Sequence, residues 1–160
     1  MLRFKLEPVD ESFFDTAPRR FAETFEIGRL AHEVWAELVA DGALSFCRSL
    51  RGARWTSPRP FGVGTMRTMP SLFGALVVEE TYFRWEEGRR QSFYADHTSL
   101  PLFRRFAEDY LVEETSTTTS RFTWTIALDP HPVTRLGDPV NSLIVKGLFE
   151  DTRRHFTALR

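Results

Sequence analysis

The sequence predicts an α+β protein in which a seven-stranded, curved antiparallel sheet wraps around one long C-terminal helix. Short runs rich in Thr, Val and aromatic residues, separated by Gly and Pro turn signals, follow one another over residues 50–129. One more alternating run precedes them, and residues 140–160 repeat their apolar side chains at helical spacing. A sheet with a single helix across it leaves room for a small apolar ligand between the two.

Length and composition indicate one domain over residues 1–160, with residues 1–18 as an N-terminal arm. The hydrophobic share of 42% and the charged share of 27% are ordinary for a globular protein. The net charge of -1 predicts no nucleic-acid partner. No apolar run approaches the roughly 20 residues of a membrane helix, and the first residues lack a signal-peptide core. We therefore expect a cytoplasmic protein without stable membrane insertion, and the sequence leaves a homodimer open.

The N-terminal third begins with an arm and then forms the first strand. Residues 1–18 have no sustained period, but Phe13 and Phe14 can anchor them to a core. Arg20 to Ile27 alternates apolar and polar residues, which predicts a half-buried strand. Glu23 falls on the apolar face of that strand.

Two short helices are predicted to follow the first strand. Gly28 ends the strand, and Leu30 to Val39 carries its apolar side chains along one side of a helix. Asp41-Gly42 then breaks the pattern, and Ala43 to Cys47 is expected to form a second short helical turn.

The remaining chain predicts six strands and the long helix. The strands are expected at about Leu50–Thr56, Gly62–Met69, Ala75–Trp85, Arg89–Thr98, Phe103–Glu114 and Arg121–Leu128. Three prolines then mark an irregular crossing before the helix at Val140–Arg160. One broad face of this helix is apolar and carries Ile144, Val145, Leu148, Phe149, Thr152, His155, Phe156 and Leu159.

The turn Glu86-Glu87-Gly88 sets which side chains of two neighbouring strands face inward. A three-residue loop with Gly88 in the left-handed conformation pairs Thr81 with Phe93 and Glu79 with Ala95. The inner face then holds Val77, Glu79, Thr81, Phe83, Trp85, Gln91, Phe93, Ala95 and His97. A two-residue loop shifts the parity and places Glu80 and Tyr82 inside instead.

Carboxylates on apolar faces are the sharpest functional signal. Glu23, Glu79 and Glu108 each lie on an otherwise apolar strand face. A carboxyl group in a dry pocket has a raised pKa and can serve as a general acid or base near neutral pH. The structural alternative is a carboxylate paired with an arginine or reaching solvent at a strand end. Arg67, one strand earlier, can neutralise a glutamate or hold a ligand carboxylate in its fork.

Other reactive residue types give weaker signals. His97 and His155 belong to a residue type that titrates in the right range for proton transfer, but a packed or hydrogen-bonded structural histidine is the better explanation of both. The chain lacks the histidine spacing of metal sites, so no metal or other cofactor is expected. Cys47 is interpreted as a small buried hydrophobe, and Gly62-Val63-Gly64 as a strand start or bulge.

The arrangement resembles the SRPBCC superfamily, also called START-like or polyketide cyclase/dehydrase-like. The similar stretches are Glu26-Ile27 leading into Val34-Trp35-Ala36-Glu37-Leu38, Gly62-Val63-Gly64-Thr65, Glu79 to Arg90 with its turn, and Arg121 to Leu128. They cover roughly residues 20–160. The resemblance implies a helix-grip fold with a cavity. Members of the superfamily include carriers, cyclases, receptors and co-chaperones, so membership does not decide the chemistry.

Two functions follow from such a cavity. The first is binding or transport of a small hydrophobic molecule that is lipid-like, aromatic or polyketide-like. The second is a cyclase, aromatase or dehydratase that uses Glu79, Glu108 or His97 as general acid or base, while Arg67 or Tyr110 holds an oxygen. The expected ligand contacts are Glu23, Arg67, Thr81, Phe83, Trp85, Phe93, Tyr110, Trp124, Ile144, Leu148 and His155. A co-chaperone-like interaction domain would need an exposed apolar patch.

Overall fold

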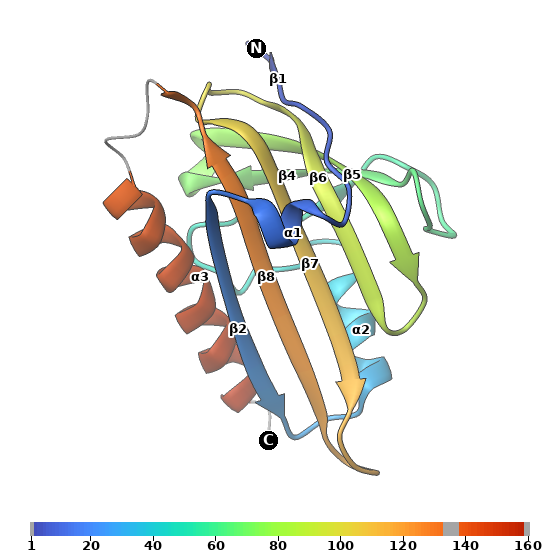
Figure 1. The fold of residues 1–160 in the computed structure, drawn as a ribbon. Helices are drawn as coiled ribbons and strands as arrows, with labels where there is room; N and C mark the ends of the chain where they lie inside the picture. The colour runs from blue at the N-terminus through green and yellow to red at the C-terminus, as the bar shows by residue number, and fades with distance from the viewer. Residues whose placement is uncertain (1, 133–137, 159–160) are drawn as a thin grey trace.

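The computed structural model describes residues 2–132 and 138–158 and has a large antiparallel sheet crossed on one face by a long helix (Figure 1). The elements are β1 (Phe4–Lys5), α1 (Phe13–Thr16), β2 (Arg19–Ile27), α2 (Ala31–Leu38), β3 (Arg54–Trp55), β4 (Met66–Ser71), the 3-10 turn η1 (Leu72–Gly74), β5 (Leu76–Glu86), β6 (Arg90–Thr98), β7 (Phe103–Glu114), β8 (Ser120–Pro130) and α3 (Asp138–Ala158). The strand order is β2-β8-β7-β6-β5-β4-β3, and β1 pairs with β6. This is the predicted helix-grip α+β fold.

The predicted strands correspond to β2–β8, and some local features differ from the prediction. The two-residue strand β1 is too short to give an alternating pattern, so the sequence did not reveal it. Ala43–Cys47 forms hydrogen-bonded turns and not the second helix that was predicted. Gly42 (φ +73°) and Leu44 (φ +66°) are both left-handed, which is incompatible with a continuing right-handed helix.

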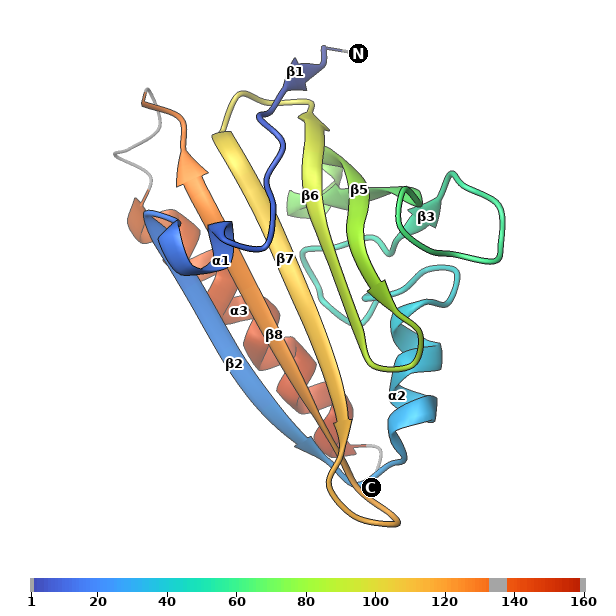
Figure 2. The ribbon, with the colours of Figure 1, turned by 45° about the vertical axis from the view of Figure 1, so that its right-hand side comes forward.

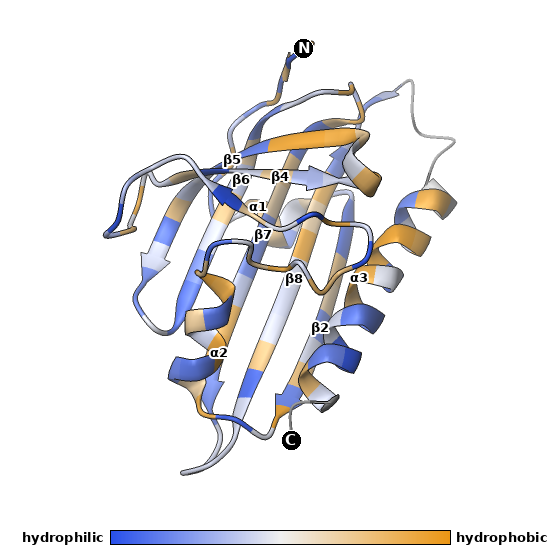
Figure 3. Ribbon diagram, turned by 180° about the vertical axis from the view of Figure 1, so that it is seen from behind, coloured by the Kyte–Doolittle hydropathy of each residue, from blue (hydrophilic) through white to orange (hydrophobic). Residues whose placement is uncertain are grey.

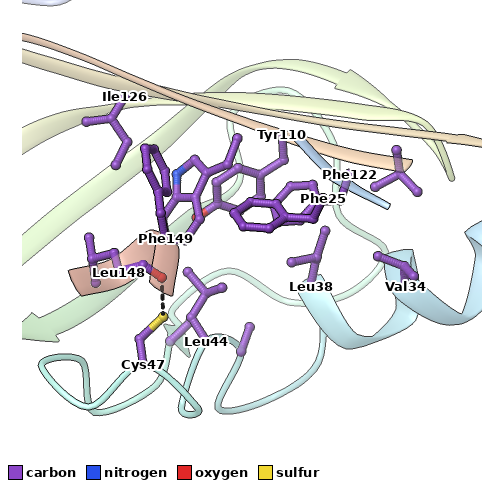
Figure 4. Close-up of a cluster of buried hydrophobic side chains, with 14 of the residues drawn as sticks. Phe25, Val34, Leu38, Leu44, Cys47, Tyr110, Phe122, Ile126, Leu148 and Phe149 are labelled. Atoms are coloured by element: carbon purple, nitrogen blue, oxygen red, sulfur yellow. Dashed lines mark hydrogen bonds between the residues drawn. The ribbon is translucent and has the colours of Figure 1, made fainter. Parts of the chain in front are cut away.

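The two faces of the sheet bury different elements (Figure 2). On the inner face, α2 and α3 cover the main core, and Figure 3 shows both helices lying over the same face of the sheet. Figure 4 shows part of this core, with Phe25, Tyr110 and Phe122 on strands opposite Leu38 of α2 and Phe149 of α3. On the outer face, α1 is anchored through its two buried phenylalanines.

Those phenylalanines, Phe13 and Phe14, pack against Ala107 and Ala127 in the middle of β7 and β8. The ring of Phe14 also stacks on Phe83, at 6.2 Å between centroids. The N-terminal segment is therefore attached to the convex side of the sheet, opposite α3.

Two bulges set the register between β5 and β6. The loop Glu87–Arg89 has three residues, and Gly88 is left-handed with φ +79°. Tyr82 pairs with Phe93 and Arg84 with Ser92, so Phe83 has no cross-strand partner. Each such extra residue reverses which side chains of a strand face inward beyond it.

The second bulge lies on β6. Glu79 pairs with His97 and Glu80 with Ala95, which leaves Asp96 without a cross-strand partner. Beyond this bulge His97 lies on the outer face together with Glu79.

The predicted pairing of Thr81 with Phe93 and of Glu79 with Ala95 is therefore wrong. Of the side chains that were expected inside, Trp85, Gln91, Phe93 and Ala95 face inward, whereas Val77, Glu79, Thr81, Phe83 and His97 face outward. Glu80 and Tyr82 take the inner positions, as the alternative parity predicted, but the cause is a bulge and not a two-residue loop.

Helix α3 lies across the concave side of the sheet with its apolar face buried. Val145, Leu148, Phe149 and Phe156 belong to the main core, while Leu159 lies outside the described residues. Within the described part of the chain, no helix combines the length and the apolar character needed to cross a membrane.

Candidate functional site

A cavity of about 100 Å³ lies between the inner face of the sheet and the first half of α3. Its walls are almost entirely apolar. The sheet contributes Met69, Leu76, Val78, Phe103, Phe106, Trp124, Ile126 and Leu128, the helix contributes Asn141, Ile144, Val145 and Leu148, and connecting segments contribute Leu44, Ser49, Leu50, Leu72 and Leu102. Two carboxyl groups, those of Glu80 and Glu108, also line it.

Glu80 is held by an ion pair that is completely buried. It faces Arg67 across the β4–β5 pairing, and Arg67 Nε lies 2.5 Å from Glu80 Oε2. The two side chains are 0% and 3% exposed. Arg67 Nη2 also donates a hydrogen bond of 3.3 Å to the hydroxyl of Tyr110. The sequence reasoning that offered Arg67 as a partner for a neighbouring glutamate corresponds to this geometry.

Aromatic rings surround the Arg67 guanidinium. Its central carbon lies 4.5 Å from the ring centre of Phe93 and between 5.3 and 5.9 Å from those of Trp55, Tyr82 and Tyr110. A desolvated guanidinium in such a cage is stabilised by the negative faces of the rings. Glu80 lines the cavity and Arg67 does not, so the carboxylate is the member of the pair that a ligand would meet.

Glu108 is the second carboxyl group of the cavity. It lies on β7, and the indole N–H of Trp124 on β8 donates a hydrogen bond of 2.5 Å to its Oε1. Burial raises the pKa of Glu108 to about 8, and the nearby negative charge of Glu80 adds to this rise. At neutral pH Glu108 is therefore mostly an uncharged acid.

The proton belongs to Glu108 and not to Glu80. Burial raises the pKa of Glu80 as well, but the positive charge of Arg67 opposes that rise. Arginine stays protonated in proteins, so an uncharged Glu80 would leave a bare cation in the core. Two adjacent carboxylates cannot both ionise easily, and the unpaired one keeps its proton. The site thus holds Arg67 positive, Glu80 negative and Glu108 neutral.

A layer of buried polar groups lies behind the cavity. Burial raises the pKa of Tyr82 and of Tyr110, so both remain neutral phenols. Among the described residues, the Tyr82 hydroxyl, Arg67 Nη1 and both side-chain polar atoms of Gln91 are buried without a hydrogen-bond partner. Polar groups without a protein partner are uncommon in a protein interior and are costly there.

Several predicted site residues lie on the other face of the sheet. Glu79 pairs with Arg3, whose Nε lies 2.8 Å from Glu79 Oε2, and His97 Nδ1 lies 3.4 Å from Nη2 of the same arginine. Thr81 donates a hydrogen bond to Asp96. Together with Phe83, these residues lie outside the cavity because of the two bulges in β5 and β6.

Three others face inward but are separate from the cavity. Glu23 pairs with Arg153 of α3 at the sheet edge. His155 stacks on Phe46, at 4.0 Å between ring centres, and hydrogen-bonds with Glu37. Trp85 packs edge-on against Trp35 of α2, at 5.6 Å between ring centres.

The structure brings the remaining candidates together. Glu108, Trp124, Ile144 and Leu148 line the cavity, and Arg67, Phe93 and Tyr110 form the layer behind it. Sequence reasoning placed Glu80 and Tyr82 inside only under the alternative parity, because their positions depend on the bulge at Phe83. It missed the apolar rim at Leu102, Phe103 and Phe106, although an apolar cluster at the start of a strand was visible in the sequence.

Comparisons with known proteins agree with this fold. A family model described as "Polyketide cyclase / dehydrase and lipid transport" matches residues 18–159. Uncharacterized proteins of Mycobacterium tuberculosis and Mycobacterium bovis are 29% identical over 161 aligned residues, covering 97% of this chain and 95% of theirs.

Two solved structures illustrate the similarity in three dimensions. A START superfamily protein from Mycobacterium smegmatis superposes with a TM-score of 0.70 at 10% identity, covering 88% of this chain and 99% of its own. The major latex-like protein 151 of Panax ginseng superposes with a TM-score of 0.62 at 15% identity, covering 86% of this chain and 97% of its own. At such low identity the similarity concerns the fold alone.

Proposed function

The chain belongs to the polyketide cyclase/dehydrase and lipid transport family, within the SRPBCC or START-like superfamily, and on that premise we propose that its cavity binds a small hydrophobic molecule. The observation that supports this is an apolar cavity between sheet and α3 that also contains two carboxyl groups. Apolar walls supply affinity and a few polar groups fix the orientation of a ligand. Lipid-like, aromatic and polyketide-like molecules all have the required apolar body.

The cavity volume limits what is enclosed. A cavity of about 150 Å³ lined by aliphatic and aromatic side chains holds a benzene molecule in another protein. The about 100 Å³ found here therefore encloses an apolar group of about four carbon atoms. A longer ligand would extend past the first turns of α3 through the mouth of the cavity.

Filling the cavity should abolish binding. We expect toluene, as a neutral apolar probe, to shift the NMR signals of methyl groups in Leu76, Ile126 and Leu128, which line the cavity. Val78→Phe places a ring in the same space and should weaken toluene binding at least about tenfold, since the probe loses its buried contact area. Val63→Phe is the matched control, because Val63 is 72% exposed and far from the lining. Unchanged binding by Val78→Phe would place the probe elsewhere and refute the proposal.

Proton transfer is the second candidate function, and the state of Glu108 favours it. A carboxyl group with a pKa of about 8 inside a cavity exchanges protons readily near neutral pH. With a bound ketone, the ionised form of Glu108 would take a proton from the carbon next to the carbonyl, and the acid form would return one. This is the elementary step that cyclases, aromatases and dehydratases of this superfamily would need.

Hydrogen exchange tests this second function directly. In D₂O, 2-hexanone should incorporate deuterium beside its carbonyl faster with the protein than in buffer, and Glu108→Gln should abolish the excess rate because an amide cannot accept the proton. Binding of 2-hexanone should persist in that variant. Glu79→Gln, on the outer face, is the matched control and should exchange like the unmodified protein. If Glu108→Gln retains the full exchange rate, Glu108 has no such role.

A further inference from the structure

The ionisable side chains of the described cavity lining are all acidic. Within the described residues, the ionisable side chains that line the cavity are Glu80 and Glu108, and both are carboxyl groups. The Nε of Arg67 is committed to Glu80, and its guanidinium lies among aromatic rings outside the lining. A ligand that reaches the polar part of the cavity therefore meets carboxyl oxygens and no guanidinium.

This arrangement is unfavourable for an anionic ligand. A carboxylate that enters loses its hydration and finds no cation among the described lining residues to replace it. It also lies beside the negative charge of Glu80. The sequence suggested that Arg67 could hold a ligand carboxylate in its fork. The geometry does not support this role, because the carboxylate of Glu80 already occupies that position.

A hydroxyl group has both a hydrogen-bond acceptor and a donor, which complement the acid form of Glu108 and the carboxylate of Glu80. Trp124 donates to Oε1 of Glu108, and within the described residues no side chain donates to Oε2. An alcohol oxygen can accept one hydrogen bond from the acid proton of Glu108 and donate its own hydrogen to the carboxylate of Glu80. One oxygen atom thus offers the acceptor that Glu108 needs and the donor that Glu80 needs.

We propose that the cavity selects hydrophobic molecules that end in a hydroxyl group over those that end in a carboxylate or carry no donor. This selectivity rests on the proposed ligand-binding function and specifies its ligand class: long-chain or cyclic alcohols, phenols and sterol-like or polyketide hydroxyls rather than fatty acids. The hydroxyl lies at the inner end, between Glu80 and Glu108, and the apolar body lies along the walls towards α3.

An isomeric pair of probes tests the need for a donor. 1-Hexanol and methyl pentyl ether have the same atoms, but only the alcohol has an O–H, and the ether partitions more readily into an apolar medium. Partitioning alone therefore favours the ether, whereas the proposed hydrogen bond favours the alcohol. In NMR titrations at pH 7 we expect 1-hexanol to bind at least about fivefold more tightly. Equal or tighter binding of the ether overturns the selectivity and leaves the ligand-binding function intact. If neither probe nor toluene binds, the ligand-binding function itself fails.

A charge-removing variant tests the exclusion of anions. Hexanoate should bind at least about tenfold more weakly than 1-hexanol to the unmodified protein at pH 7. Glu80→Gln removes the repelling charge and releases Arg67, so the affinity for hexanoate relative to that for 1-hexanol should rise at least about tenfold. Glu79→Gln alters the neighbouring outward residue and should leave both affinities unchanged. Folding of Glu80→Gln is verified first by circular dichroism, and if that variant does not fold, the alcohol-to-ether ratio of the unmodified protein decides. A folded Glu80→Gln that still rejects hexanoate contradicts the proposal.

Discussion

Replacing Arg67 with Met is expected to lower the free energy of unfolding by about 4 kcal/mol at pH 7. The Arg67 side chain is fully buried and its partner Glu80 is 3% exposed. Without the guanidinium, the folded protein must either bury a bare carboxylate or protonate it, and both cost free energy. Urea unfolding followed by circular dichroism measures the change. The deficit should shrink at pH 4, where Glu80 takes up its proton more cheaply.

The outer face provides a matched control. Arg3 and Glu79 form a second Arg–Glu pair, and Glu79 is one residue along β5 from the buried Glu80, but the Arg3 side chain is 57% exposed. Arg3→Met should leave the unfolding midpoint almost unchanged, since water solvates the remaining carboxylate. In the double variant Arg67→Met/Glu80→Leu, removal of both charges should recover most of the lost stability. A single Arg67→Met variant as stable as the parent protein would contradict a charged pair at this position.

Glu108 should make the protein less stable as pH rises. The pKa of Glu108 is about 8 in the folded protein and near 4.5 in an unfolded chain, so between these values the folded form binds the extra proton. The contribution of Glu108 to the free energy of unfolding is therefore highest below pH 4.5. It falls as the pH rises to 8, because deprotonation favours the unfolded state. The slope is about 1.4 kcal/mol per pH unit in the middle of this interval and smaller near each of the two pKa values, so the loss over the interval is about 4 kcal/mol.

Glu108→Gln should remove this loss because the amide does not titrate. Relative to the unmodified protein, the variant should gain about 4 kcal/mol of stability between pH 4.5 and pH 9. Urea unfolding curves at half-unit pH intervals measure the difference between the two proteins. Glu79→Gln serves as a control and should not reproduce the gain. A constant difference between Glu108→Gln and the parent across this range would show that Glu108 is ionised in the folded protein at neutral pH.

The sequence determined the architecture well because the architecture depends on patterns that are local. Alternation predicted β7 and β8 almost to the residue, and turn signals separated them correctly. The apolar face of α3 was likewise visible from its period. The exceptions involve segments with no period, such as β1 with its two residues and the turns around Leu44 with its positive φ.

The candidate site was only partly predictable because it depends on cross-strand register. Glu108 on the continuous strand β7 was identified, since its pairing with β8 has no irregularity near that residue. The register with a three-residue loop assigned Glu80 to the wrong face because Phe83 occupies a bulge. No local residue pattern indicates the position of this bulge. A single unpaired residue thus exchanged Glu79 for Glu80 at the cavity, and with it the partner of Arg67.

The bulge at Phe83 also has a consequence for comparing related genes. The unpaired residue turns an aromatic ring outward, where Phe14 stacks on it, and turns Glu80 inward, where Arg67 holds it. A relative that lacks one codon in this part of β5 would present the opposite set of side chains to its cavity while keeping the same strands. Single-residue gaps at this point in an alignment should therefore mark relatives whose β5 presents different side chains to the cavity.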